Sequence, residues 1–560
     1  MTGPAQTVPR RPPAQVMTLS RLGSFHQCRL SFVRILTRRM AEDGWSFTRP
    51  EFQIDGSGVG HAVYSAIGPA RSYSLVAFAH DLPDAQRSDR VIAEAWDATF
   101  VLFDGVPTAD DITRLGQNVP QQETGRITET ELTLSRANRS VRLWEHVVSA
   151  LAMGEQPDAA MVSEIGYLMR TTAVYGSGKF GAADREKIAD RPEMQVPFQA
   201  EMLTVYLIRT FVRDMVNHMA QVKGGAQAVP LAPQIARQLG IGNSTGLGMA
   251  PFIVNHPVLF NNWIVVREEA LARVRSIERP TRAEIDTFLD ILARSEVSIS
   301  RWTSAHPLQI EKLARLRNDL GLLRRYIEAG DLTGPSMWDS LVTWSQSALS
   351  EEGQELIVSL VLEPYGPLID GMAHCMADNG QASCIDGAMP ISRVKALLKH
   401  TFGWALDVNW DDPENCARAW YVSAEKLEPR LGERFEEPVA DYEQPLAPAR
   451  DAAKAHAALE DWPSETAIAD FLIQHPEHRH TIRRAQVFPR APYGEINGNT
   501  IGADVLPIDM LRAKLSFFGA THFDPRSDRW VRICMYAGAP YPEDLQTTNA
   551  DTWVYPELTA

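Results

Sequence analysis

The chain has 560 residues, a mass of 62.3 kDa and a formal net charge of −15 at pH 7, and 44% of its residues are hydrophobic. A chain of this length exceeds one hydrophobic core, so we expect about two to four domains, and the ordinary balance of apolar and charged residues excludes disorder over most of it. The negative charge disfavours a nucleic-acid backbone or an anionic membrane surface as partner, because each of them binds basic surfaces.

The cysteines and the N-terminal residues bear on the compartment. Five widely spaced cysteines do not form a disulfide framework, which favours a reducing cytosol. The first residues lack the apolar core of a signal peptide, and no uninterrupted apolar run approaches the ~18 residues that cross a bilayer. The sequence therefore predicts a soluble, cytoplasmic protein. Its length is compatible with a homo-oligomer, although no helix carries a sustained heptad seam.

The N-terminal part is expected to form an α+β domain over residues 16–130, after a proline-rich, disordered tail at 1–15. Apolar residues recur at helical intervals over 19–40, which predicts a helix. Thr108 is expected to cap a short helix that ends near Leu115. Strands of a small antiparallel sheet are expected at 62–67, 72–78 and 98–103, where β-branched and aromatic residues lie between turn-forming residues.

Residues 131–405 are expected to form a helical central domain that carries two glycine-rich loops. Apolar stripes over 285–292 and 313–327 follow the three-and-four spacing of a helix. The segment 302–307 is expected to turn between them, so the two helices should pack as an antiparallel hairpin. A further helix is predicted at 394–400.

The composition changes again in the last part of the chain. Residues 406–465 are rich in proline, alanine and acidic residues, which predicts a connecting arm that is helical only around 451–459. Residues 466–560 are expected to form a C-terminal α+β domain. Its predicted elements are a hairpin at Asn497-Gly498, a helix at 508–518 and a strand at 530–536. The predicted fold is mixed α+β and predominantly helical, with a central helical domain flanked by two smaller α+β domains.

The first glycine-rich loop follows a candidate strand at 171–175 and has the pattern G-x-G-x-x-G, formed by Gly176, Gly178 and Gly181. Such glycines let backbone N–H groups approach an anion. The residues after the loop lack the amphipathic helix and second strand of a dinucleotide-binding unit, and the loop does not fit a Walker A motif. It is either a plain turn or a nest for a carboxylate or phosphate. The side chains expected to hold that anion are Tyr175, Lys179 and Arg185.

A predicted helix over 197–221 places an acid among apolar residues. Glu201 falls within the apolar arc of this helix when its residues are projected at about one hundred degrees each. A carboxyl group on a buried stripe requires a partner, and buried carboxyls have raised pKa values that suit general acid–base catalysis. The alternative is that Glu201 lies in the first turns and only favours the helix dipole.

The second glycine-rich loop begins at Gly242, and residues 242–246 fit the G-x-S-x-G pattern with Ser244 as nucleophile. That motif requires a preceding strand, whereas 234–240 reads as the end of a helix, so the serine-hydrolase match is interpreted as accidental. Polar loops on a helical scaffold commonly bind ligands. The candidate ligand-binding groups are Asn243, Ser244, Thr245 and His256. A helix C-cap at Gly240 or Gly242 is the structural alternative.

No metal site is predicted, because the cysteines lack paired spacing and the histidines at 475, 478 and 480 read as a basic surface segment. The cofactor remains unidentified. The hypothesis is an enzyme, of lyase or hydrolase class, that acts on a small anionic metabolite with Tyr175, Lys179, Glu201 and His256 as catalytic residues. Gly176, Gly178, Gly181, Arg185, Asn243, Ser244 and Thr245 would bind the substrate. The alternatives are a non-catalytic oligomeric binding protein, whose acidic arm reaches a neighbouring subunit, and a serine hydrolase that uses Ser244.

Overall fold

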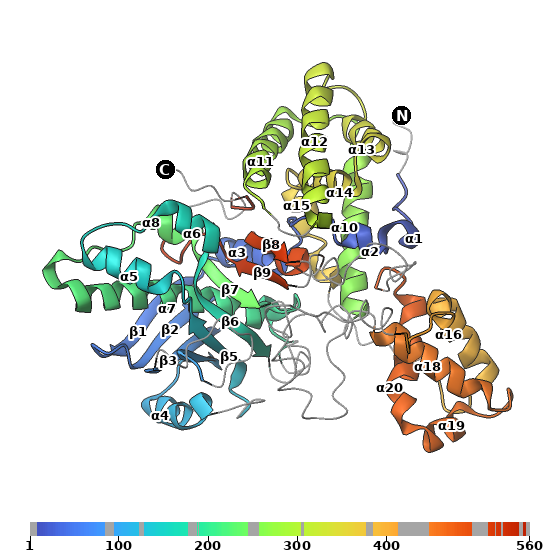
Figure 1. The fold of residues 1–560 in the computed structure, drawn as a ribbon, viewed down its shortest axis with the longest axis horizontal. Coiled ribbons are helices and arrows are strands. Elements are labelled where there is room, and N and C mark those ends of the chain that lie inside the picture. The colour runs from blue at the N-terminus through green and yellow to red at the C-terminus, as the bar shows by residue number, and fades with distance from the viewer. Residues whose placement is uncertain are drawn as a thin grey trace.

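The computed structural model describes most of the chain. The described residues are 8–83, 95–121, 128–176, 188, 190–244, 257–303, 307–376, 385–412, 447–494, 513, 515–520, 522–527, 530–547 and 553–555. Within them the protein is mixed α/β and predominantly helical (Figure 1).

The described strands form one sheet, although they come from distant parts of the chain. Their order is β1-β2-β3-β4-β5-β6-β7-β9-β8. All neighbouring strands are antiparallel except β6 and β7, which are parallel. The strands are β1 (Ser46–Ile54), β2 (Gly60–Ile67), β3 (Ser72–Ala79), β4 (Ala98–Asp104), β5 (Glu131–Arg139), β6 (Tyr167–Gly176), β7 (Gly240–Ser244), β8 (His522–Ser527) and β9 (Trp530–Met535).

The helices divide into those on the sheet and those that pack with one another. Beside the sheet are α3 (Phe32–Glu42), α4 (Ala109–Asn118), α5 (Trp144–Ala152), α6 (Ala159–Ile165), α7 (Gln199–Gly224) and α8 (Pro233–Gln238). An upper group in Figure 1 contains α10 (Pro257–Arg275), α11 (Arg282–Ser300), α12 (Pro307–Ala329), α13 (Met337–Ala348), α14 (Glu351–Leu362) and α15 (Gly366–Asp370), with α1 (Pro13–Val16) and α2 (Leu19–Leu22) against it. An outlying group contains α16 (Ile391–Leu406), α18 (Ala447–Glu460), α19 (Ile468–Gln474) and α20 (Arg479–Ala485).

The long helix α7 covers one face of the sheet. The ring of Phe211 on α7 contacts that of Phe100 on β4, with centroids 5.5 Å apart, and Phe211 is fully buried. The other face carries a separate small core, in which apolar side chains of β2, β3 and β4 pack with Ile112 and Leu115 of α4. Because successive side chains of a strand point to opposite faces of the sheet, the same strands contribute side chains to both cores.

Both outer strands carry a proline where their pairing is irregular. The register of β1 shifts between Thr48 and Glu51, around Pro50, and that of β8 shifts between Asp524 and Ser527, around Pro525. Proline has no N–H to donate, and a bulge twists a strand away from a would-be neighbour. These features disfavour addition of another strand to either edge.

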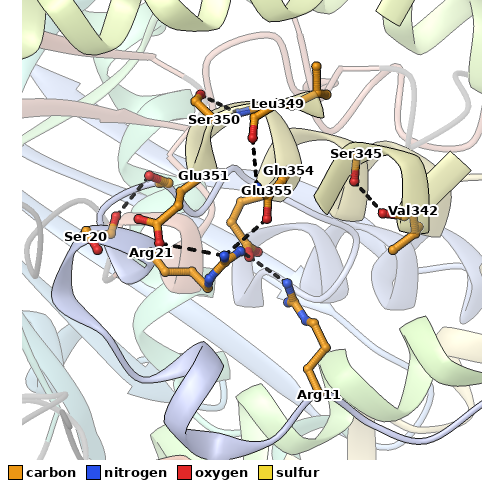
Figure 2. Close-up of polar contacts among 12 residues, drawn as sticks. Arg11, Ser20, Arg21, Val342, Ser345, Leu349, Ser350, Glu351, Gln354 and Glu355 are labelled. Carbon is orange, nitrogen blue, oxygen red and sulfur yellow. Dashed lines mark hydrogen bonds and ion pairs between the residues drawn. The ribbon is translucent and has the colours of Figure 1, made fainter. Parts of the chain in front are cut away.

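An ion-pair network binds the N-terminal segment to the helical group (Figure 2). Arg11 donates two hydrogen bonds to Glu268, at 2.7 and 2.6 Å, and one to Glu355 at 2.8 Å. Glu355 also accepts from Arg21 at 2.8 Å and from Arg267 at 2.7 Å. All five residues are buried. Burial alone would raise the pKa of Glu355, but the charges of Arg11, Arg267 and Arg21 more than offset this and lower it.

A second set of ion pairs fixes α3 to the same helices. Arg34, which is fully buried, donates two hydrogen bonds to Glu363 at 2.6 and 2.7 Å. Arg29 and Arg38 both donate to Asp370, at 3.0 and 2.6 Å. Residues 8–41 therefore join the sheet layer to the helical group through arginine–carboxylate pairs.

Several sequence predictions are confirmed. Strands occupy the three N-terminal predicted positions, and Thr108 caps α4 in a capping box with Asp111. The helical hairpin is formed by α11 and α12, α18 covers the helical part of the arm, and β9 matches the predicted C-terminal strand. The candidate strand at 171–175 lies within β6.

Other expectations were wrong. The N-terminal helix is broken, because α2 and α3 are separated by a buried loop. Residues 8–15 are packed rather than disordered, since Arg11 is held by the network above. The C-terminal strands do not make a sheet of their own but extend the N-terminal sheet through β7. The strands β1, β5, β7 and β8 were not predicted. The expected hairpin at Asn497-Gly498 and most of the helix at 508–518 lie outside the described residues, and the domain boundaries remain a prediction.

Candidate functional site

The two glycine-rich loops begin at the ends of adjacent parallel strands. In the β6–β7 pair, Arg170 is opposite Gly242 and Thr171 is opposite Asn243. The strand β6 ends at Gly176 and β7 ends at Ser244, so each strand runs directly into one of the loops. Because parallel strands end at the same edge of a sheet, both loops leave that edge. The crossover between the two strands contains α7.

Glu201 lies in the first turn of α7 and is only 6% exposed. One turn later, the hydroxyls of Thr204 and Thr133 are hydrogen bonded at 2.6 Å. Thr133 on β5 is the register partner of Gly176 on β6. The start of α7 therefore lies over the part of the sheet from which the first glycine-rich loop departs.

In the strand register, Tyr175 and Gly176 occupy positions on opposite faces of the sheet. Tyr175 is opposite Leu134, which packs with the small core under α4, whereas Gly176 is opposite Thr133, which contacts α7. Successive positions on a strand alternate between its faces. Gly176 is thus at the register position that faces α7, and the register gives no support for placing Tyr175 with Glu201.

Two residues with left-handed backbone conformations bracket the start of α7. Phe198 immediately precedes the helix with a φ of 62°, and Tyr536, which follows β9, has a φ of 63°. The Tyr536 hydroxyl donates a 2.8 Å hydrogen bond to the carbonyl of Met202. Such conformations are costly for non-glycine residues and often occur at functional sites, where the surrounding structure enforces them. Both therefore mark the surroundings of Glu201 as a constrained part of the fold.

An unpredicted polar cluster holds the segment that leads into α7. Arg191 donates to Asp104 at 2.7 Å, and the buried hydroxyl of Tyr73 donates to Glu193 at 2.5 Å. Burial and the neighbouring Glu193 raise the pKa of Tyr73, so it remains a neutral donor at physiological pH. Asp104 ends β4 at the edge where β6 also ends. No sequence motif signals this cluster, because its members are far apart in the chain.

The remaining predicted site residues are placed unevenly. Asn243 and Ser244 lie in β7, paired through their backbones with Ile533 and Arg532 of β9. The predicted helix end is confirmed, because α8 ends at Gln238, but a strand that the sequence did not predict, β7, follows it and supplies the strand that a nucleophile elbow requires before Ser244. Gly178, Lys179, Gly181, Arg185, Thr245 and His256 lie outside the described residues.

Within the described ranges, no group of three or more His, Cys, Asp or Glu side chains is arranged to hold a metal ion. The histidines at 475, 478 and 480 are close in sequence, and two of them contact the same carboxylate. Oε1 of Glu477 is 3.2 Å from Nδ1 of His475 and 3.9 Å from Nε2 of His478. Among the residues that the structure describes, no single helix is long and apolar enough to span a membrane, and one bent pair, Glu351–Leu362 with Gly366–Met376, passes that test only when joined.

Comparison with known proteins adds no relative. No protein-family model, no curated protein and no solved structure matches the chain.

Proposed function

We propose that the protein is a cytosolic enzyme that acts on a small anionic metabolite, a carboxylate or a phosphate, by acid–base chemistry of the lyase or hydrolase type. The observation that supports it is the parallel pairing of β6 with β7, each of which leads directly into a glycine-rich polar loop. In sheets with parallel strands, ligands commonly bind outside the carboxyl ends of those strands.

The residues of this edge have complementary chemistry. Glycines after β6 can present N–H groups to an anion, and Lys179 and Arg185 add positive charge. Asn243, Ser244, Thr245 and His256, from the second loop, would orient the substrate by hydrogen bonding. Glu201, buried at the start of α7, would transfer the proton. Tyr175 lies in β6 just before the first loop, and because its register partner Leu134 packs on the other face of the sheet, Tyr175 is left out of the proposed proton transfer.

Native mass spectrometry of the purified protein tests the proposal. A retained anion is expected as additional mass that disappears on denaturation, and Lys179→Ala should abolish it. Lys223→Ala is the matched control, because Lys223 is exposed near the far end of α7. Once a turnover assay exists, Glu201→Gln should reduce kcat by about 10²-fold or more, as loss of a general acid or base does. Full binding and turnover in both variants would refute the proposed site.

The serine-hydrolase alternative gains one observation, the strand that ends at Ser244. In a nucleophile elbow the serine is activated by a histidine and lies on a sharp turn after its strand. A fluorophosphonate probe should label wild-type protein and not Ser244→Ala if this alternative holds. Absence of labelling under native conditions would remove it and leave the acid–base proposal.

A further inference from the structure

The outlying helical group carries a basic surface in an otherwise acidic protein. From Arg479 to Gly494 the chain contains four arginines and a histidine but no acidic residue. On α20, Arg479, His480 and Arg483 are exposed, and Lys454 of α18 is exposed as well. We call these four residues the α20 basic face.

The charges of this face lack carboxylate partners among the described residues. Within the described residues, Arg479 donates only one long hydrogen bond, 3.4 Å from its Nε to the carbonyl of Leu472, and Arg483 makes no ion pair or hydrogen bond. The nearby acids are otherwise engaged: Asp451 binds Arg450 at 3.0 Å and Glu477 binds His475 at 3.2 Å. Uncompensated clustered cations favour an anionic partner.

The same cluster perturbs the histidine within it. Burial lowers the pKa of His480, and the positive charges of Arg484 and Arg483 lower it further against the opposing charge of Asp451. The contribution of the two arginines to this shift has the sign expected beside an excess of positive charge.

The sequence supplies an acidic segment next to this face. Residues 435–446 contain Glu436, Glu437, Asp441 and Glu443 and no basic residue. They lie outside the described residues, and α18 begins directly after them at Ala447. Asp451, in the second turn of α18, acts electrostatically on His478 and His480. An extended chain covers ~3.3 Å per residue, so the acidic residues nearest in sequence to α18 are close enough to reach the basic face.

We propose that the α20 basic face is a docking surface for the acidic segment 435–446 of the same chain. The contact would neutralise the arginines locally and fix the connection between α16 and α18 against α20. The inference is independent of the glycine-rich loops, so the failure of one proposal leaves the other standing.

Zero-length carbodiimide coupling of the full-length protein tests the proposal. A double variant, Arg479→Lys and Arg483→Lys, keeps both charges and supplies amines, with Lys454 as a native amine. Peptide mapping should show links from these lysines to Glu436, Glu437, Asp441 or Glu443. The yield should fall by about tenfold at 1 M salt, because exposed charges are then screened beyond roughly 3 Å.

Two controls make the outcome decisive. Replacing the four acids with Glu436→Gln, Glu437→Gln, Asp441→Asn and Glu443→Gln should remove the links while leaving those to Asp451 or Glu477. Mixing light and ¹⁵N-labelled protein should yield links within one isotope class. Links only to Asp451 or Glu477, or links between the two isotope classes, would overturn docking within one chain, the latter in favour of a second copy.

Discussion

At the scale of single residues, the loop between α2 and α3 contains a buried amide that finds no partner among the described residues. Gln27 is 7% exposed, and neither its amide nitrogen nor its amide oxygen makes a hydrogen bond there. An unsatisfied buried polar group costs free energy that an apolar side chain of the same shape does not. Gln27 is therefore a position where the native side chain opposes folding unless it binds water or a ligand.

Gln27→Met is expected to leave the free energy of unfolding unchanged or to raise it by up to about 1 kcal/mol. Chemical denaturation measures the difference. Gln354→Met is the matched control, because the amide of Gln354 donates to Leu349 at 2.8 Å and accepts from Arg21 at 3.1 Å, and its loss should destabilise the fold. If Gln27→Met is as damaging as the control, Gln27 has a partner that the protein structure alone does not contain.

Asp319 provides a pH-dependent prediction. Burial raises its pKa, hydrogen bonds from Ser350 lower it, and the charge of Glu352 raises it, with a net increase above 3.8. The folded protein therefore binds this proton more tightly than the unfolded chain does. Protonated Asp319 therefore stabilises the fold at low pH, and this stabilisation is lost as the pH rises from 3.8 through the higher pKa of the folded state. An Asn at this position does not titrate, so Asp319→Asn should not lose stability over this interval.

The expected result is that Asp319→Asn gains stability relative to wild type between acidic and neutral pH. Thermal unfolding from pH 3 to pH 7 measures this. Glu131→Gln should show the opposite trend: burial raises the pKa of Glu131, but hydrogen bonds from Thr128, Arg114 and Thr130 lower it overall, so its stabilisation is lost as pH falls. If the stability of both variants relative to wild type changes with pH in the same direction, the assigned pKa shifts are wrong.

At the scale of elements, the N-terminal segment is held chiefly by permanent charges. Glu355 accepts from three guanidinium groups in a buried site. Removing one partner of a buried ion pair is costly, because the remaining charges keep their desolvation penalty. Glu355→Gln should therefore reduce the free energy of unfolding by about 3–5 kcal/mol.

Limited proteolysis and urea denaturation check this prediction, and cleavage within the first twenty or so residues should accelerate. Glu351→Gln is the control, because Glu351 is 3.7 Å from Arg21 but its side chain is 41% exposed. Such an exposed pair should contribute less than about 1 kcal/mol. Equal effects of the two substitutions would contradict the network as the anchor of the segment.

Elements with a local signal were predictable. The capping box at Thr108 and the apolar stripes of α11 and α12 are encoded within one or two turns of the chain. The missed strands have weak local signals: β1 contains Pro50 and charged residues, and β7 consists of Gly240-Ile-Gly-Asn-Ser244. Pairing with neighbours, rather than propensity, makes them strands.

At the scale of the whole molecule, the sheet unites both ends of the chain. The C-terminal strand β9 pairs with β7, which lies almost three hundred residues earlier in the sequence. No periodicity in the sequence reports such a pairing, so the sequence predicted separate N- and C-terminal α+β domains. The sequence likewise indicated the polar loops and Glu201 as candidate site residues, because their signals are local. It did not indicate the parallel pairing of β6 with β7, which places the two loops at one edge of the sheet.

The central claim is that both loops and Glu201 serve one anion site, and ligand-induced thermal stabilisation tests it most directly. A panel of small carboxylates and phosphates should contain an anion that raises the Tm of the wild type, since saturation at 100 times Kd contributes about 2.7 kcal/mol. Lys179→Ala in the first loop and Asn243→Ala at the second should each abolish the rise for the same anion, while Lys223→Ala keeps it. A rise that survives either loop substitution would show that the two loops do not share a site.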